Sequence, residues 1–131
     1  MALNVKRSAL AVGGLAIALG MMAQGSAQAA TGTGKTSPSY YGNATFNTST
    51  GRLTVNDTKT DSRRVVATVW NTDLGYVEVV SGQDANGDNG VPGTATASGG
   101  YSSGDLLMIE VCRRNGAGGA DTDCGYGYVT A

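Results

Sequence analysis

The chain contains no histidine, and among its 131 residues only two are cysteine, two are proline, one is tryptophan and one is phenylalanine. Without histidine a Ser-His-Asp triad is impossible, and the commonest general base and zinc ligand is missing. Beyond residue 29 the only lysines are Lys35 and Lys59, which leaves little material for a Ser-Lys nucleophile. The two cysteines do not form a Cys-x-x-Cys pair, which argues against thiol oxidoreductase chemistry. These absences predict a protein that is not an enzyme.

The N-terminal residues have the pattern of an export signal. Lys6 and Arg7 precede an apolar, uncharged stretch over residues 8–23, and Ala27-Gln28-Ala29 supplies a small-x-small cleavage motif. The apolar stretch is short for a membrane span and contains three glycines. We therefore expect a secretory signal peptide over residues 1–29, of bacterial type, and a secreted, extracellular protein with no membrane span in its mature form.

The charge that remains after cleavage is acidic. Two of the nine basic residues and none of the ten acidic ones lie in residues 1–29, so the mature chain carries a net charge of −3. That balance is unfavourable for a nucleic-acid groove or for a polybasic membrane patch. Export also makes a structural disulfide between Cys112 and Cys124 the expected state of the two cysteines.

The mature chain reads as a short leader followed by one β-rich domain. Residues 30–39 have no apolar periodicity and predict a flexible N-terminal leader, whereas residues 40–131 alternate between β-branched runs and turns. No stretch shows helical periodicity, and glycine is too dense for a helical domain. Seven strands are expected, at residues 40–46, 52–56, 64–71, 76–81, 94–98, 106–113 and 124–130. Several of them are apolar on both faces, which favours an all-β, small antiparallel β-sandwich over a single open sheet. The disulfide would then hold the last two strands together.

The stretch Gly32-Thr33-Gly34-Lys35-Thr36 has a superficial likeness to a phosphate-binding loop. The pattern also needs a glycine five residues before Gly34, where Ala29 stands, and a strand before and a helix after the loop. Neither element is expected here, so the stretch is assigned to the leader.

The loop around residue 84 is a weak candidate for calcium. Asp84, Asn86 and Asp88 place oxygen ligands at alternate positions among glycines, which suits a hard cation. Asn89 and Ala95 stand where a calcium loop of the EF-hand type needs glycine and glutamate, so a site would have few ligands. The alternative is that Asp, Asn and Gly simply form a turn. No other cofactor is expected.

Aromatic residues are the remaining candidates for recognition. Exposed tyrosines commonly anchor proteins and sugars, and Tyr126 and Tyr128 share one face of the last expected strand. The alternative is that these rings pack against the core. The aromatic residues concerned are Tyr40, Tyr41, Tyr76, Tyr101, Tyr126, Tyr128 and Trp70.

Three segments carry a resemblance to a known family. They are Leu53-Thr-Val55-Asn-Asp57-Thr with Asp61-Ser62, then Val111-Cys112, and Gly116 to Cys124. On these segments residues 40–131 resemble the small secreted β-sandwich proteins of filamentous actinobacteria, some of which are adaptor subunits of umbrella toxin particles. The resemblance implies an adaptor that joins a lectin subunit to a repeat-bearing toxin polypeptide, with a flexible N-terminal segment inserted into the lectin subunit. By position, the matching segment here is Thr31, Gly32, Thr33, Gly34, Lys35, Thr36, Ser37 and Pro38.

Two other function classes stay open. A secreted protease inhibitor could offer the loop Ser81 to Gly93, or the loop Asn115 to Asp123, to an enzyme, although glycine makes both loops flexible. A calcium- or glycan-binding surface module could be built on the Asp84 loop and the tyrosines. Loss of binding on chelation distinguishes the last class from the adaptor and the inhibitor.

Overall fold

The computed structural model describes residues 29–131. The predicted signal peptide lies outside the described residues, apart from its last residue, Ala29. Within the described part no helix is long and apolar enough to cross a membrane.

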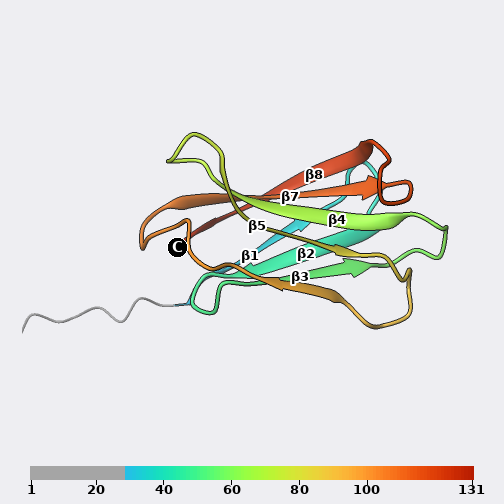
Figure 1. Cartoon of the computed structure of the whole chain (residues 1–131), viewed down its shortest axis with the longest axis horizontal. Helices are drawn as coiled ribbons and strands as arrows, with labels where there is room; N and C mark the ends of the chain where they lie inside the picture. Colours follow the sequence, from blue (N-terminus) through green and yellow to red (C-terminus); the bar gives the residue numbers. More distant parts are fainter. Residues whose placement is uncertain (1–28) are drawn as a thin grey trace, which may run out of the picture.

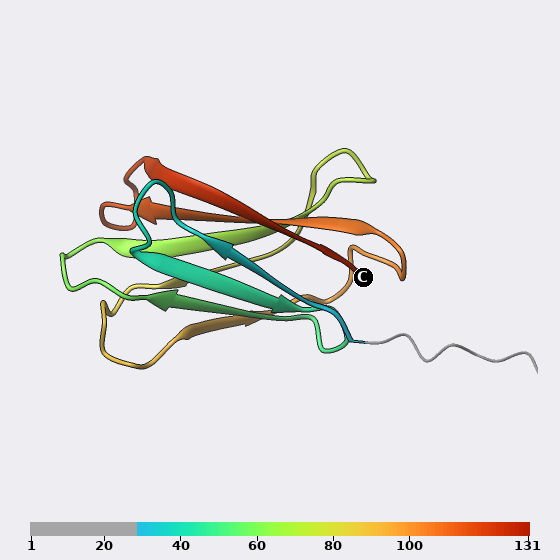
Figure 2. The same cartoon turned by 180° about the vertical axis from the view of Figure 1, so that it is seen from behind.

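The described residues form eight strands, all paired in antiparallel fashion, and no helix. The strands are β1 (Thr31–Lys35), β2 (Gly42–Asn47), β3 (Arg52–Asp57), β4 (Arg64–Asn71), β5 (Val77–Asp84), β6 (Gly93–Thr96), β7 (Leu106–Arg114) and β8 (Asp121–Thr130). They make two four-stranded sheets, sheet A in the order β1-β2-β3-β6 and sheet B in the order β5-β4-β7-β8. The sheets lie face to face, with β1 beside β8 along one side and β6 beside β5 along the other (Figures 1 and 2). The predicted all-β, antiparallel, two-sheet fold is confirmed.

The core lies between the two sheets and is made of the inward residues of each alternating strand. It consists of Ala44, Phe46, Leu53, Val55, Val65, Ala67, Val69, Val80, Leu107, Ile109, Val111 and Val129. Burying these side chains is the main favourable term in folding, at about 25 cal/mol per Å² of apolar surface. Strands β1 and β6 add no large apolar side chain to it, so the core rests on the six other strands.

The two outer faces differ in chemistry. On sheet A the register aligns one threonine from each strand in a single row across the sheet: Thr33, Thr45, Thr54 and Thr94. Cross-strand threonine pairs stabilise sheets and keep an exposed face polar. On sheet B the outward residues include Trp70, Met108, Tyr126 and Tyr128. The outward aromatic side chains of the strands are therefore on sheet B.

The predicted disulfide is confirmed and joins the last two strands. Cys112 in β7 is bonded to Cys124 in β8, with 4.1 Å between their Cα atoms. The register between β7 and β8 shifts between Val111 and Arg113, so the disulfide lies at a β-bulge.

The expectation of a flexible leader over residues 30–39 is wrong for its first half. Residues 31–35 form strand β1, which pairs with β2 from Thr31↔Asn47 to Lys35↔Asn43. The sandwich therefore has eight strands, where the sequence predicted about seven. The strand was missed because its two inward residues, Gly32 and Gly34, are glycines and give no apolar alternation.

Candidate functional site

The side of the sandwich where β1 meets β8, here called the seam, is built from glycine. Its inward positions are Gly32 and Gly34 in β1, and Gly125 and Gly127 in β8. A Cβ atom on Gly125 would overlap the carbonyl oxygen of Lys35, and one on Gly127 would overlap that of Thr33. The backbones of the two strands therefore pack directly on each other, because no side chain stands between them.

The segment after β1 is fastened to both sheets. The hydroxyl of Thr36 is fully buried, accepts the backbone N–H groups of Tyr41 and Gly42, and donates to the carbonyl of Ser39 at 2.6 Å. The N–H of Ser37 donates to the carbonyl of Asp123 in β8 at 3.0 Å. These bonds give the seam fixed walls at this end of the molecule.

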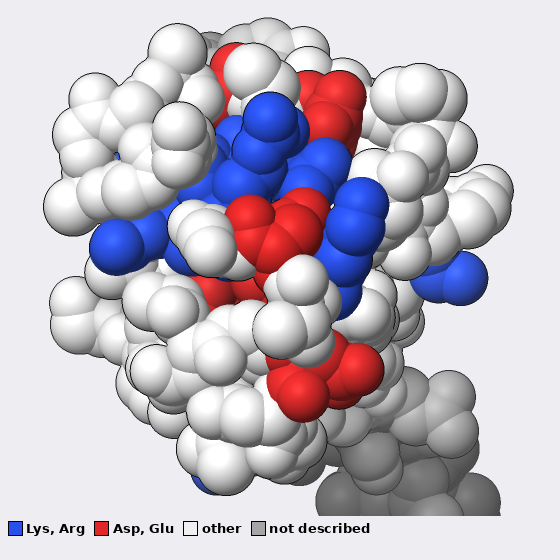
Figure 3. Space-filling model, turned by 90° about the vertical axis from the view of Figure 1, so that its right-hand side faces the viewer, with Lys and Arg blue, Asp and Glu red and all other residues white. Residues whose placement is uncertain are grey.

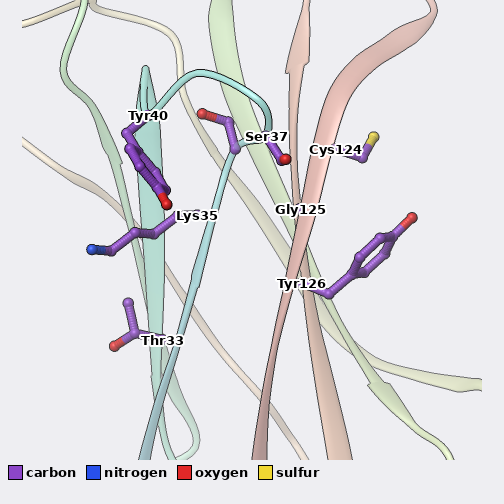
Figure 4. Close-up of a pocket in the computed structure, with 8 residues that line it drawn as sticks. Thr33, Lys35, Ser37, Tyr40, Cys124, Gly125 and Tyr126 are labelled. Carbon is purple, nitrogen blue, oxygen red and sulfur yellow. The ribbon is translucent and has the colours of Figure 1, made fainter.

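An open groove of about 560 Å³, here called the seam groove, runs along this side. It is lined by Thr33, Lys35, Thr36, Ser37, Tyr40, Cys124, Gly125 and Tyr126. Figure 4 shows Lys35 and Tyr40 on the β1 side, Tyr126 on the β8 side and Ser37 between them. The ammonium of Lys35 lies 5.3 Å from the centre of the Tyr40 ring. The Tyr40 and Tyr126 side chains are 76% and 55% exposed, so two rings frame the groove and remain free to contact a partner.

The predicted leader residues divide between structural and surface roles. Four of them line the seam groove, namely Thr33, Lys35, Thr36 and Ser37, and two more, Gly32 and Gly34, form its glycine seam. Thr31 lies at the exposed start of β1, and Pro38 lies in the exposed turn after it. The segment is thus held as the edge of sheet A and lines a groove between the sheets.

The end of the molecule beside the groove carries interleaved charges (Figure 3). The guanidinium of Arg113 is buried, pairs with Asp61, and bonds Asp123 at 3.2 Å. The same guanidinium and the ammonium of Lys59 lie 4.3 and 3.8 Å from the centre of the Tyr41 ring. The hydrogen bond with Ser39 lowers the pKa of the Tyr41 hydroxyl, and the charge of Lys59 acts in the same direction. These contacts tie the turn after β3 to β7 and β8.

The residues proposed as calcium ligands do not all face one cavity. Asp84 is buried, and its two carboxylate oxygens accept the N–H groups of Asp57, at 2.9 Å, and Asn86, at 3.1 Å. A small cavity of about 180 Å³ is lined by Asp57, Asp84 and Asp88, but not by Asn86. In the described residues the one grouping of three metal-ligating side chains is Glu110, Cys112 and Cys124, and both of its sulfurs are in the disulfide. Calcium binding stays a prediction.

The hairpin that joins β4 to β5 lies at the end of the sandwich opposite the charged end (Figures 1 and 2). Three of its apolar residues, here called the hairpin patch, are exposed: Leu74, Tyr76 and Val77 are 58%, 60% and 47% exposed. Buried Asn71 holds its backbone in place, accepting from the N–H groups of Asp73 and Leu74 and donating to Gly100 and Asp105. The sequence singled out Tyr76 but not Leu74 or Val77, because the local pattern does not show whether an apolar side chain at the end of a strand is covered.

The tyrosines divide into side chains packed on the core and side chains exposed on the surface. Tyr101 packs edge to face on Phe46, with ring centres 5.6 Å apart, and its hydroxyl donates to the carbonyl of Thr48. Tyr40, Tyr76, Tyr126 and Tyr128 are exposed. Four of the six tyrosines are thus available to a partner, and two of these frame the seam groove.

The two candidate inhibitor loops are shorter than the sequence suggested. Ser81 to Asp84 belongs to β5 and Asp121 to Asp123 belongs to β8, so the connections are residues 85–92 and 115–120.

Comparison with known proteins returned no matching family model, no matching curated protein and no matching solved structure.

Proposed function

We propose that this protein is a secreted, non-enzymatic protein-binding module that joins two other extracellular proteins, in the manner of the adaptor subunit of a toxin particle. The observation that carries the proposal is the seam groove with its two exposed tyrosines, Tyr40 and Tyr126, held on rigid walls. Tyrosine supplies a large contact area at a low cost in side-chain entropy, which makes it a frequent anchor in interfaces. An adaptor also needs a second surface, and the hairpin patch supplies one at the far end.

The groove suits an extended peptide segment of a partner. Its walls offer hydroxyls from Thr33 and Ser37, a positive charge from Lys35 and two rings. A chain lying along the groove can place side chains against both rings while its polar groups meet the hydroxyls and the ammonium. We expect the partner segment to carry an acidic residue opposite Lys35.

The test is capture of partners from the culture supernatant of the producing cells with the affinity-tagged protein, read by mass spectrometry. The double variant Tyr40→Ala/Tyr126→Ala should lose one of the captured proteins, while the wild type retains it in fixed stoichiometry. A matched control is Tyr128→Ala, which removes an equally exposed ring that does not line the groove. If the double variant captures the same proteins as the control, the groove is not the binding site.

A further inference from the structure

The outer face of sheet B contains a hollow that none of the roles above uses. Its volume is about 480 Å³, which lies within the size range of small-ligand sites. The register brings outward side chains of three strands together there, because Thr68 pairs with both Ser81 in β5 and Glu110 in β7, and Trp70 pairs with Glu78 in β5. The full lining is Val66, Ala67, Thr68, Trp70, Glu78, Ser81, Gly82, Gln83, Glu110, Arg114 and Asp121.

The indole of Trp70 is fixed by a diagonal contact. In β7, Met108 lies directly opposite Trp70. The indole Nε1 of Trp70 nevertheless donates to Oε2 of Glu110, two positions further along β7, at 2.8 Å. Diagonal neighbours in a sheet lie within reach of a long or aromatic side chain, and this hydrogen bond fixes the position of the indole between β4 and β7. Trp70 lines the hollow and is only half-buried, so the indole is held at its wall and is accessible to a ligand.

The polar groups around the indole are also held in place. Gln83 accepts from Arg64 at 3.1 Å, and Arg114 makes a two-point pair with Asp121 at 2.6 and 3.0 Å. Groups fixed in this way lose little conformational entropy when a ligand binds. Three carboxylates and one guanidinium line the hollow, so its charge opposes an anionic ligand such as a nucleic acid or a polyuronate.

We propose that this hollow binds a neutral carbohydrate, with one sugar ring stacked on the indole of Trp70. The apolar C–H face of a sugar matches a flat aromatic ring, and its hydroxyls are donors that suit the carboxylates of Glu78 and Glu110. Ser81, Gln83 and Thr68 add groups that both donate and accept, which sugar hydroxyls require. A peptide ligand would be recognised through its own side chains and would not need a flat aromatic ring surrounded by hydrogen-bond acceptors. The inference is independent of the protein-binding role, because the seam groove lies at the edge of the sandwich.

The chain contains a single tryptophan, so its fluorescence reports directly on this hollow. The secreted protein should be titrated with soluble oligosaccharides of cellulose, chitin, xylan and starch, and its retention on the corresponding insoluble polymers should be measured. We expect a saturable change of the Trp70 emission with at least one of these sugars, and retention on the same polymer. No change with any of them, or an emission change that only a protein produces, would overturn the proposal.

Variants separate a stacking role from a structural one. Trp70→Ala should weaken retention on the polymer by about tenfold or more, which corresponds to about 1.4 kcal/mol, whereas Trp70→Phe should keep most of it. Glu78→Ala, at an exposed position, should weaken binding several-fold with the emission probe still in place. Tyr40→Ala, in the seam groove, should leave sugar binding unchanged. Equal retention by Trp70→Ala and the wild type, or full retention by Glu78→Ala, contradicts the assignment.

Discussion

Glycine residues at the seam decide how closely the two sheets approach. Gly125 sits where even one added methyl group would overlap the Lys35 carbonyl oxygen, whereas a Cβ on Gly118 would have no atom within 4 Å. Neither residue has the positive φ that strains other amino acids. Comparing alanine substitutions at Gly125 and Gly118 therefore separates the destabilisation caused by steric overlap from the effect on stability of replacing any glycine by alanine.

Gly125→Ala is expected to destabilise the protein by about 1–3 kcal/mol, because the methyl group forces the seam apart. Gly118→Ala is expected to be neutral or to stabilise by up to about 1 kcal/mol, because it only restricts the unfolded chain. Urea unfolding followed by circular dichroism measures both. Equal effects of the two substitutions would show that the seam is not closely packed.

Asp57 gives a pH dependence whose sign follows from its surroundings. Burial raises the pKa of Asp57 above its ordinary value of 3.8, and the nearby carboxylates of Asp61 and Asp84 act in the same direction. The folded protein thus holds this proton more tightly than the unfolded chain does. The associated stability is complete below the unfolded pKa and is lost as the pH rises through the folded pKa.

Asp57→Asn keeps an oxygen that can accept from the N–H of Lys59 and removes the titration. The wild type should therefore be most stable relative to this variant near ~pH 3, and its advantage should decline toward a constant value by ~pH 7. Unfolding free energies of both proteins across that range give the difference, in which the titration of carboxylates that do not interact with Asp57 cancels. A difference that stays flat, or grows with pH, contradicts the placement of Asp57.

Among the elements, β7 and β8 are joined both by their ladder and by the disulfide. Cys112 and Cys124 are 12 residues apart, and in the chain-entropy model closing such a loop stabilises the fold by about 3 kcal/mol. The double variant Cys112→Ser/Cys124→Ser should lose about 2–4 kcal/mol, measured by urea unfolding. Reduction of the wild type should produce a similar loss. Unchanged stability in both cases would mean that the strand ladder alone fixes this edge.

Strand β1 tests whether the N-terminal segment is a free arm or part of the sandwich. Deleting residues 30–36 removes one of the two strands that pair with β2, and it uncovers the inward face of β8, including Val129, against which Gly32 packs. We expect a lower melting temperature and faster proteolysis of the remaining domain. The control Thr33→Ala/Lys35→Ala keeps the strand and alters only exposed side chains, so its stability should change by less than about 0.5 kcal/mol. A deletion variant as stable as the wild type would restore the free-arm interpretation.

For the molecule as a whole, alternation of apolar residues was enough to predict the two-sheet fold. Val65, Ala67 and Val69 in β4, and Leu107, Ile109 and Val111 in β7, face the core as their spacing indicates. The predicted export signal and the presence of two cysteines were enough to predict the disulfide. β1 was not predicted, because the burial of a glycine depends on what packs against it and not on its own hydrophobicity.

The candidate site was only partly accessible from the sequence. Thr33, Lys35, Thr36 and Ser37 were singled out, but as an arm, and nothing in the local pattern placed them opposite Tyr126 across a seam. The alternation of glycine in Thr31–Lys35 and again in Gly125-Tyr126-Gly127 was the available signal. Its meaning depends on which strands become neighbours, and that is a property of the whole fold.

The two proposed binding surfaces, the seam groove and the hairpin patch, lie at opposite ends of the sandwich, so two partners could bind without competing for the same surface. The most direct measurement is a comparison of the proteins captured from culture supernatant by Tyr40→Ala/Tyr126→Ala, by Leu74→Ala/Val77→Ala and by the wild type, quantified by mass spectrometry. We expect the wild type to retain two proteins, the groove variant to lose one of them and the hairpin-patch variant to lose the other. If both variants retain everything that the wild type retains, or the wild type retains nothing in fixed stoichiometry, the protein is not an adaptor.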